Sequence, residues 1–240
     1  MSENQFYGTG FPYLNIQDCP GKLIVLEGSD GVGRSTQTQL LRRWLEDEGY
    51  AVSDTGLRRS DLTQEGLEEA KKGHTLSRIT MSLFYATDFA DRLENQIIPA
   101  LQAGFVVLSD RYFYSIMARD IVRGADPEWA HKLYGFALKP DLVLYLKADV
   151  SDLLSRLIHG RGLNYWEAGM DMHSADNLFD SFLDYQSKLI GMFDQMAQAY
   201  GFVTVDAGRP IMEVFEDLQE HIRALLEDQQ MNLEDEMVLL

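Results

Sequence analysis

Eight consecutive residues of this chain have the types and spacing of a loop that binds phosphate. The segment Gly28-Ser29-Asp30-Gly31-Val32-Gly33-Arg34-Ser35 matches G-x-x-x-x-G-K-[ST], except that arginine stands at the lysine position. Glycines let the backbone turn tightly and direct successive N–H groups inward, and a helix that starts at the end of the loop adds its positive end. We expect this loop and Thr36 to hold ATP, with the Ser35 hydroxyl free to bind Mg²⁺. The alternative is a glycine-rich turn with no ligand.

Arg34 is the unusual residue of this loop. Lysine acts there as a compact charge that reaches the β- and γ-phosphate oxygens, whereas arginine carries the same charge on a larger planar fork. The exchange is compatible with phosphate binding. It predicts a shifted or weakened phosphoryl transfer.

A second candidate site follows the apolar run at residues 105–110. Asp110 and Arg111 close that run, and open α/β sheets form their ligand crevice at the carboxyl ends of strands. A structural salt bridge is the alternative for such a pair. Beside a phosphate loop, Arg111 is predicted to clamp the phosphate of an acceptor and Asp110 to be a carboxylate on the magnesium side.

Alternating strand and helix patterns must position these residues. Short apolar, β-branched runs predict strands at residues 23–27, 105–110 and 142–146, with weaker signals at 51–54 and 202–206. Helical periodicity predicts helices at residues 35–48, 83–101, 176–200 and 211–226. This alternation predicts an α/β protein, in which a parallel sheet of about five strands has helices on both faces.

Length and composition limit the organisation and the partners. A chain of 240 residues with 45% hydrophobic content is expected to form one domain at 22–226, after an irregular lead-in at 1–21 and before an acidic tail at 227–240. A net charge of −17 argues against nucleic acid as a partner. The single cysteine allows no internal disulfide, and neither a signal peptide nor an apolar run of roughly 18 residues is evident. We therefore expect a cytoplasmic protein with no membrane contact.

Four segments resemble the thymidylate kinase family, and together they extend over roughly residues 22–225. They are the loop EGSDGVGRSTQ at 27–37, the long helix at 83–104, Asp110-Arg111-Tyr112 followed by Ser115, and KPDLVLYL at 139–146. The resemblance implies a three-layer P-loop NTPase fold with a small lid near 155–167. It also implies transfer of the ATP γ-phosphate to dTMP with Mg²⁺, for nucleotide biosynthesis. The long apolar-striped helices suit a homodimer, as in families that the chain resembles.

The resemblance also implies roles for individual residues. Asp30, Arg34 and Arg111 are catalytic, together with the lid arginines Arg156 and Arg161, which close over the donor. The acceptor is bound by Arg58, Arg59, Tyr85, Phe89, Arg111 and Ser115, with Tyr85 stacking on the base. The metal lies at Ser35 and Asp110.

Three departures from the family pattern bear on the substrate. Counting back from Pro99, Phe89 stands where family members commonly have an arginine that hydrogen-bonds thymine. Ala118-Arg119-Asp120 stands where the family has A-Y-Q, whose tyrosine is associated with preference for deoxyribose. The third departure is Arg34. Two alternatives therefore stay open: a P-loop kinase of another nucleoside monophosphate or phosphorylated small molecule, and a nucleotide-binding regulatory protein with little turnover.

Overall fold

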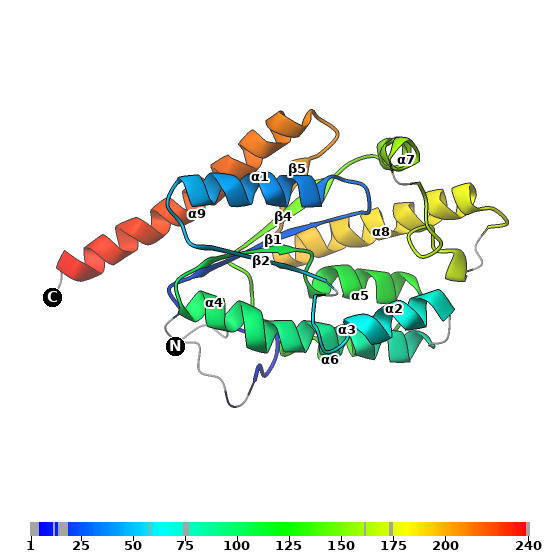
Figure 1. Cartoon of the computed structure of the whole chain (residues 1–240), viewed down its shortest axis with the longest axis horizontal. Coiled ribbons are helices and arrows are strands. Elements are labelled where there is room, and N and C mark those ends of the chain that lie inside the picture. Colours follow the sequence, from blue (N-terminus) through cyan, green and yellow to red (C-terminus); the bar gives the residue numbers. More distant parts are fainter. Residues whose placement is uncertain are drawn as a thin grey trace.

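A parallel sheet forms the centre of the molecule. The computed structural model describes residues 5–11, 13, 19–57, 59–73, 77–160, 162–172 and 175–238, with the backbone alone beyond residue 227. Five strands pair in the order β2-β3-β1-β4-β5 (Figure 1). They are β1 (Lys22–Gly28), β2 (Val52–Gly56), β3 (Val106–Asp110), β4 (Leu142–Lys147) and β5 (Val203–Asp206). The predicted fold class and all five predicted strands are confirmed.

The strand register brings the two candidate sites together. Leu26 of β1 pairs with Asp110 of β3, and Gly28 of β1 pairs with Leu146 of β4. Since all pairs are parallel, the carboxyl ends of β1 and β3 meet at one edge of the sheet. The phosphate loop after β1 therefore starts beside Asp110 and Arg111.

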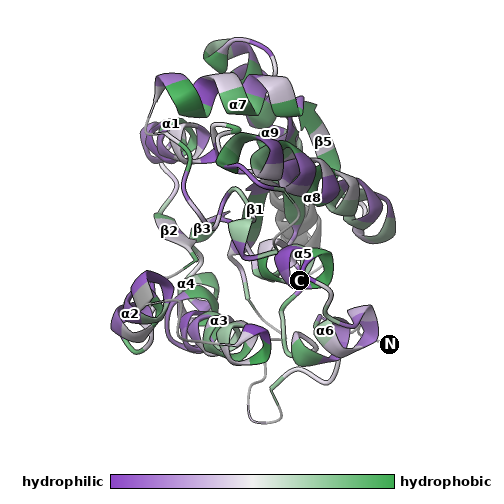
Figure 2. Ribbon diagram, turned by 90° about the vertical axis from the view of Figure 1, so that its right-hand side faces the viewer, coloured by the Kyte–Doolittle hydropathy of each residue, from purple (hydrophilic) through white to green (hydrophobic). Residues whose placement is uncertain are grey.

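Helices cover both faces of the sheet, because successive strand residues face opposite sides. Ile24 and Leu26 belong to a core shared with α1, α7 and α9, whereas Leu23 and Val25 belong to a core shared with α3, α4, α5 and α8. Figure 2 shows the apolar sides of these helices turned toward the strands. Their bounds are α1 (Arg34–Asp47), α3 (Arg78–Arg92), α4 (Ile98–Gln102), α5 (Phe113–Val122), α7 (Val150–His159), α8 (Leu178–Tyr200) and α9 (Ile211–Val238).

Two helices extend beyond their predicted limits. The long helix predicted at 83–101 begins earlier, at Arg78, and runs from α3 through a π-helical turn, η1 (Leu93–Ile97), into α4. The last helix, α9, continues to Val238, so the backbone of the acidic tail prolongs that helix. Two short helices, α2 (Gln64–Gly73) and α6 (Pro127–Leu133), and a 3₁₀ turn, η2 (Met170–Met172), complete the described elements.

The N-terminal lead-in packs against the domain. Phe6 forms an isolated antiparallel bridge with Leu138. The hydroxyl groups of Tyr7 and Tyr114 lie 2.5 Å apart. Because Tyr114 belongs to the first turn of α5, the lead-in supports the helix that follows Asp110 and Arg111.

Candidate active site

The glycines of the phosphate loop adopt conformations that other residues rarely reach. The φ angles of Gly28, Gly31 and Gly33 are 141°, 82° and 103°. A Cβ at Gly28 would lie 2.4 Å from the carbonyl oxygen of Leu146. The loop leads directly into α1, whose first N–H groups have no partner within the helix and favour an anion. The backbone therefore has the form that a phosphate-binding loop requires.

Arg34 folds back onto the beginning of the loop. Its Nη1 donates to the carbonyl oxygens of Gly28 and Ser29, both at 2.5 Å, and its Nε donates to Asp110 Oδ1 at 2.9 Å. The residue is only 8% exposed. The loop cation is thus held by its own loop and by the carboxylate at the end of β3.

Ser35 and Asp110 supply oxygen atoms next to this cation. Ser35 Oγ donates to Asp110 Oδ2 at 2.8 Å. Burial acts to raise the pKa of Asp110, but Arg34, Arg111 and the Ser35 hydroxyl together hold it below its usual value. Asp110 is therefore ionised at neutral pH.

This pair of oxygen donors fits Mg²⁺. Magnesium is usually held by one or two protein oxygens together with waters and substrate phosphates, rather than by a complete protein cage. Within the described part of the chain, no cluster of three or more His, Cys, Asp or Glu side chains could hold a metal alone. Ser35 and Asp110 are thus the side chains that would hold the ion with a bound nucleotide.

Arg111 has a left-handed backbone, with a φ of 77°. Such a conformation in a non-glycine residue costs on the order of 1–3 kcal/mol and is often found at functional sites. It directs the guanidinium toward the loop, where the side chain donates to Gly28 O at 3.2 Å, Ser115 Oγ at 2.8 Å and Asp30 Oδ1 at 2.5 Å. Burial and the neighbouring Arg34 lower the pKa of Arg111 to about 10, against the opposing effect of Asp30. The side chain therefore remains a cation at neutral pH.

A second arginine reaches the same carboxylate, and the sequence analysis assigned it no role. Arg119 Nη2 donates to Asp30 Oδ1 at 3.2 Å and to Oδ2 at 3.0 Å. Burial alone would lower the pKa of Arg119, but the Asp30 charge raises it. The sequence signal for Arg119 was its position shortly after Arg111, in the segment that forms α5.

Glu27 is another site residue that the sequence analysis missed. Its carboxylate accepts from the backbone N–H groups of Tyr112 (2.8 Å) and Ser115 (3.2 Å) and from Ser115 Oγ (2.6 Å). Complete burial raises the pKa of Glu27, although Arg111 and these hydrogen bonds oppose the shift. Glu27 fixes the first turn of α5, and therefore Arg111, against β1. The sequence signal for Glu27 was its charge, because a charged residue is unusual in an otherwise apolar strand.

Arg156 lies against the phosphate loop. It donates to Val32 O at 3.2 Å and to Ala207 O at 2.7 Å. Gly31 lies against Leu157, since a Cβ at this glycine would be 2.9 Å from Leu157 Cγ. Helix α7 is therefore packed onto the loop. Arg161 lies outside the described residues.

The segment after the predicted lid is fixed to α5 by Arg123. Its guanidinium binds both carboxylate oxygens of Asp171, at 2.8 and 3.1 Å, and donates to Trp166 O at 3.2 Å. The same group lies 4.7 Å from the centre of the Tyr185 ring. Trp166 and Asp171 are thus anchored beside the helix that carries Arg119.

Two of the predicted acceptor residues lie at the edge of the site. Arg59 is about half exposed and donates to Asp54 Oδ2 at 2.8 Å. Tyr85 is 9% exposed, and the ammonium of Lys71 lies 5.3 Å from its ring centre. Arg58 lies outside the described residues.

The expectation for Phe89 needs correction. Its side chain is fully buried among aromatic rings, with Tyr112 at 4.8 Å and Phe136 at 5.6 Å between ring centres. A side chain enclosed in this way is not accessible to a nucleotide, so we no longer assign Phe89 to the acceptor.

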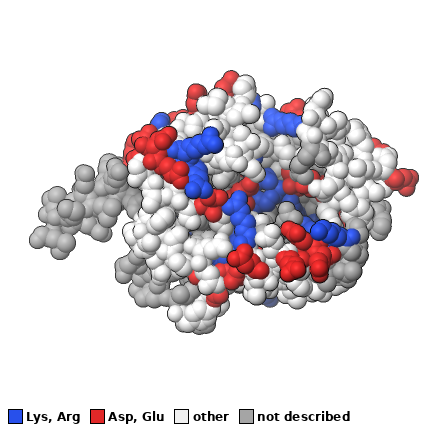
Figure 3. Space-filling model, in the orientation of Figure 1, with Lys and Arg blue, Asp and Glu red and all other residues white. Residues whose placement is uncertain are grey.

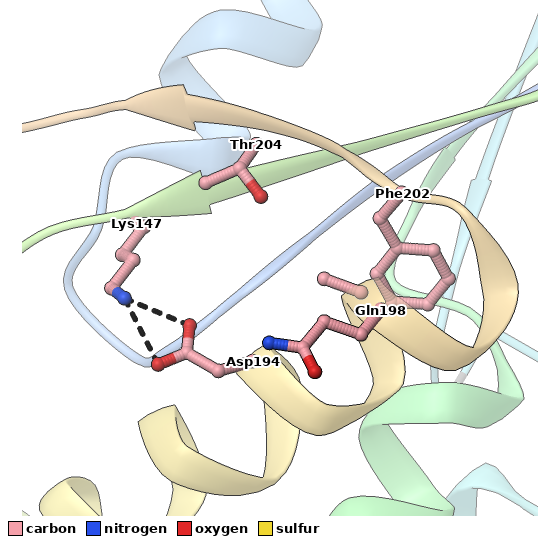
Figure 4. Close-up of a pocket in the computed structure, with 6 residues that line it drawn as sticks. Lys147, Asp194, Gln198, Phe202 and Thr204 are labelled. Carbon is pink, nitrogen blue, oxygen red and sulfur yellow. Dashed lines mark hydrogen bonds and ion pairs between the residues drawn. The ribbon is translucent and has the colours of Figure 1, made fainter.

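Charge and shape distinguish this site from the rest of the surface. Figure 3 shows basic side chains gathered in the middle of one face, with acidic side chains on either side. A separate hollow of about 340 Å³ is lined by Lys147, Asp194, Gln198, Phe202 and Thr204 (Figure 4). There Lys147 and Asp194 point toward each other and form an ion pair at 2.9 Å. The two charges of this hollow thus pair with each other.

Comparisons with known proteins agree with this geometry. The sequence model of the family described as thymidylate kinase matches residues 26–218. "Probable thymidylate kinase 2" of Saccharolobus solfataricus is 40% identical over 202 residues, which are 83% of this chain and 94% of that protein. "Thymidylate kinase" of Caldicellulosiruptor saccharolyticus is 32% identical over 215 residues, which are 86% of this chain and 98% of that protein. No helix in the described residues is long and apolar enough to cross a membrane. The chain belongs to the thymidylate kinase family.

Proposed function

We propose that the protein catalyses ATP + dTMP → ADP + dTDP. A phosphate oxygen of dTMP forms a bond to the γ-phosphorus of ATP, and the bond from that phosphorus to the β,γ-bridging oxygen breaks. One observation supports this proposal above the others: three largely buried guanidinium groups lie at the phosphate loop, those of Arg34, Arg111 and Arg119. The chain as a whole has a net charge of −17. A strongly acidic protein needs such local cations to bind two polyanions.

On the donor side, the loop backbone and Arg34 bind the phosphates of ATP. Phosphoryl transfer depends mainly on positioning and on neutralising charge. Arg156 extends from α7 over the loop and donates to a carbonyl of the loop itself, at Val32. A small movement of α7 transfers this guanidinium from that carbonyl to the γ-phosphate, and Arg161 is proposed to join it from the lid.

Ser35 and Asp110 are proposed to hold Mg²⁺ beside the nucleotide. When bound, the ion neutralises charge on the β- and γ-phosphate oxygens. The residues themselves orient the nucleotide, since the Ser35 hydroxyl is turned toward Asp110 and lies at the start of α1. A Ser35→Ala variant should need more Mg²⁺ for half-maximal rate, whereas Ser187→Ala, at an exposed serine of α8, should not.

On the acceptor side, Arg111 is proposed to bind the phosphate of dTMP. Ser115 and Asp30 hold its guanidinium in place, and Asp30 is shared with Arg119. Arg58 and Arg59 are proposed to contact the same phosphate, and Tyr85 is proposed to supply a ring for the base.

We also propose a cytoplasmic homodimer that acts in nucleotide biosynthesis. Exposed apolar side chains support the dimer: Ile79 and Leu83 are 64% and 45% exposed and lie one turn apart on α3. A sedimentation measurement that gives a monomer at micromolar concentration would remove this part of the proposal.

One observation favours a second candidate, a nucleotide-binding protein with little turnover. Arg34 is already satisfied by Gly28, Ser29 and Asp110, so a nucleotide must compete for it. ADP release from ATP, measured with and without dTMP, separates the two. Release that requires dTMP supports the kinase, and tight ATP binding without such release supports the alternative.

A further inference from the structure

The N-terminal lead-in is bound along the segment that joins α6 to β4. Three backbone hydrogen bonds connect the two stretches, from Lys139 N to Gln5 O at 2.8 Å, from Tyr7 N to Ala137 O at 3.0 Å and from Gly10 N to Gly135 O at 3.4 Å. A Cβ on Gly8 would lie 2.8 Å from the carbonyl oxygen of Gly135, so the two backbones are in direct contact there. Residues 5–11 are therefore fixed on the domain, and we call them the N-terminal strap.

Tyr7 of the strap packs against the first turn of α5. Its ring centre lies 5.3 Å from that of Phe113 and 6.1 Å from that of Tyr114, with the ring planes at 60° and 80°. Its hydroxyl lies 2.5 Å from the hydroxyl of Tyr114, a residue that is 0% exposed. Burial raises the pKa of both hydroxyls, so two neutral phenols share this hydrogen bond. Because edge-to-face ring pairs and hydrogen bonds are directional, these contacts fix the position of the turn as well as covering it.

The same turn of α5 positions Arg111. Ser115 Oγ accepts from the Arg111 guanidinium at 2.8 Å, and the Arg111 backbone is left-handed, with a φ of 77°. Glu27 holds the turn from β1, since its carboxylate accepts from the N–H groups of Tyr112 and Ser115. Tyr7 holds the turn from the strap. The geometry of the proposed acceptor arginine therefore depends on a residue of the lead-in.

The strap lies outside the sequence pattern that defines the family. The family sequence model matches residues 26–218, whereas the strap is at 5–11. The hydrogen bonds and ring contacts described for Tyr7 involve α5, Ala137 and Tyr200 rather than the phosphate loop. An effect of Tyr7 on the reaction should thus reach the acceptor side through α5 and leave the donor side largely unchanged.

We propose that Tyr7 is a positioning residue for the acceptor: it holds the first turn of α5 so that the Arg111 guanidinium is preorganised for the acceptor phosphate. The inference rests on the proposed function through the role of Arg111. A positioning residue acts through another group, so its effect disappears when that group is removed. This property separates positioning from a general contribution to stability.

The test is a double-mutant cycle of Tyr7→Ala and Arg111→Ala, measured as kcat/KM for dTMP at saturating ATP on protein with a cooperative melting curve. Tyr7→Ala alone should lower this value by roughly 10- to 100-fold, because a displacement of about 1 Å in a positioned group can cost that much. The KM for ATP should change little. In the Arg111→Ala background, the same change at Tyr7 should cost less than about twofold.

A conservative variant and a matched control complete the experiment. Tyr7→Phe keeps the ring contacts and removes only the hydroxyl, so its kcat/KM should lie above that of Tyr7→Ala and within roughly tenfold of wild type. If Tyr7→Ala does not fold, the cycle is run with Tyr7→Phe. Tyr13→Ala, at an exposed tyrosine of the lead-in that donates to Glu94, should leave kcat/KM for dTMP unchanged.

Three outcomes would overturn the inference, and two of them leave the proposed function intact. Wild-type kcat/KM for dTMP in folded Tyr7→Ala would show that α5 keeps its position without this contact. Losses that add in free energy in the double variant, as they do for independent sites, would show that Tyr7 does not act through Arg111. Wild-type protein that forms no dTDP would overturn the proposed function and the inference together.

Discussion

Arg34 donates its Nε–H to Asp110 Oδ1 across 2.9 Å, which joins the phosphate loop after β1 to the end of β3. The same guanidinium holds two carbonyl oxygens of the loop, so it connects the backbone that binds the donor to the carboxylate proposed to face the metal. This arrangement gives arginine a structural reason to occupy a position where lysine is the usual residue.

Arg34→Met should therefore lose most of the activity. The variant removes the cation and leaves the largely buried Asp110 carboxylate without its nearest positive charge. Arg34→Lys should keep or raise the rate, because a compact ammonium can reach the β- and γ-phosphates. The measurement is kcat/KM for ATP, with Arg42→Met, at an exposed arginine of α1, as the control. An active methionine variant would show that the loop cation is dispensable.

Arg111→Ala should raise the KM for the acceptor or lower kcat/KM, with ATP affinity little changed. One lost charge-assisted hydrogen bond to phosphate predicts roughly a 10- to 150-fold effect. A larger loss would indicate an additional role in the transition state. Steady-state kinetics on protein with a wild-type melting curve provide the measurement. If the folded variant uses dTMP as well as wild type does, the arginine is structural.

A buried ion pair in α3 should be important for stability rather than for transfer. Arg92 Nε and Asp88 Oδ2 lie 3.1 Å apart, and both side chains are 0% exposed. Arg92→Met leaves a buried carboxylate without its cation, which costs about 3–5 kcal/mol and should lower the melting temperature by about 6–20 °C.

The double variant Asp88→Leu/Arg92→Met should recover part of this loss, because no uncompensated charge remains. The exposed pair Lys132 and Glu128 provides the control, and Lys132→Met should change stability by less than about 1 kcal/mol. If Arg92→Met and Lys132→Met lower the free energy of unfolding by the same amount, the buried pair has no special importance for stability.

Asp120 should make stability depend on pH. Burial raises the pKa of this carboxyl to about 6, above its ordinary value of 3.8, although Ser82, Arg123 and Arg119 act against the shift. Between these values the folded chain keeps a proton that the unfolded chain has released, so stability falls as pH rises toward 6 and stays lower above it.

The Asp120→Asn variant has no carboxyl group at this position, so it lacks this pH-dependent change in stability. Its melting temperature should therefore rise relative to wild type as the pH increases from about 4 to about 6.5. Melting curves of both proteins across this range make the comparison. Parallel curves would show that Asp120 titrates normally in the folded chain.

The sequence predicted the parts of the site that depend on local pattern. The apolar run ending at Gly28 and the glycine spacing after it determine a strand and a loop, and Asp110 and Arg111 mark the end of a second strand. Contacts between distant segments were not predictable in this way. The ion pair of Arg119 with Asp30 depends on the placement of α5 against the loop, which no local periodicity specifies.

The Phe89 assignment failed for a different physical reason. Counting along the sequence locates a position on α3, but it does not show that the rings of Tyr112 and Phe136 enclose the Phe89 side chain.

Quantification of products from a panel of acceptors tests the central claim most directly. Wild-type protein is incubated with ATP, Mg²⁺ and dTMP, dUMP, dCMP or dAMP, and nucleotides are separated by chromatography. We expect dTDP and ADP to form in equal amounts, with the highest kcat/KM for dTMP, a lower value for dUMP and much lower values for the other two. ADP formed without any nucleoside diphosphate from the acceptor, or a clear preference for dCMP or dAMP, would contradict it.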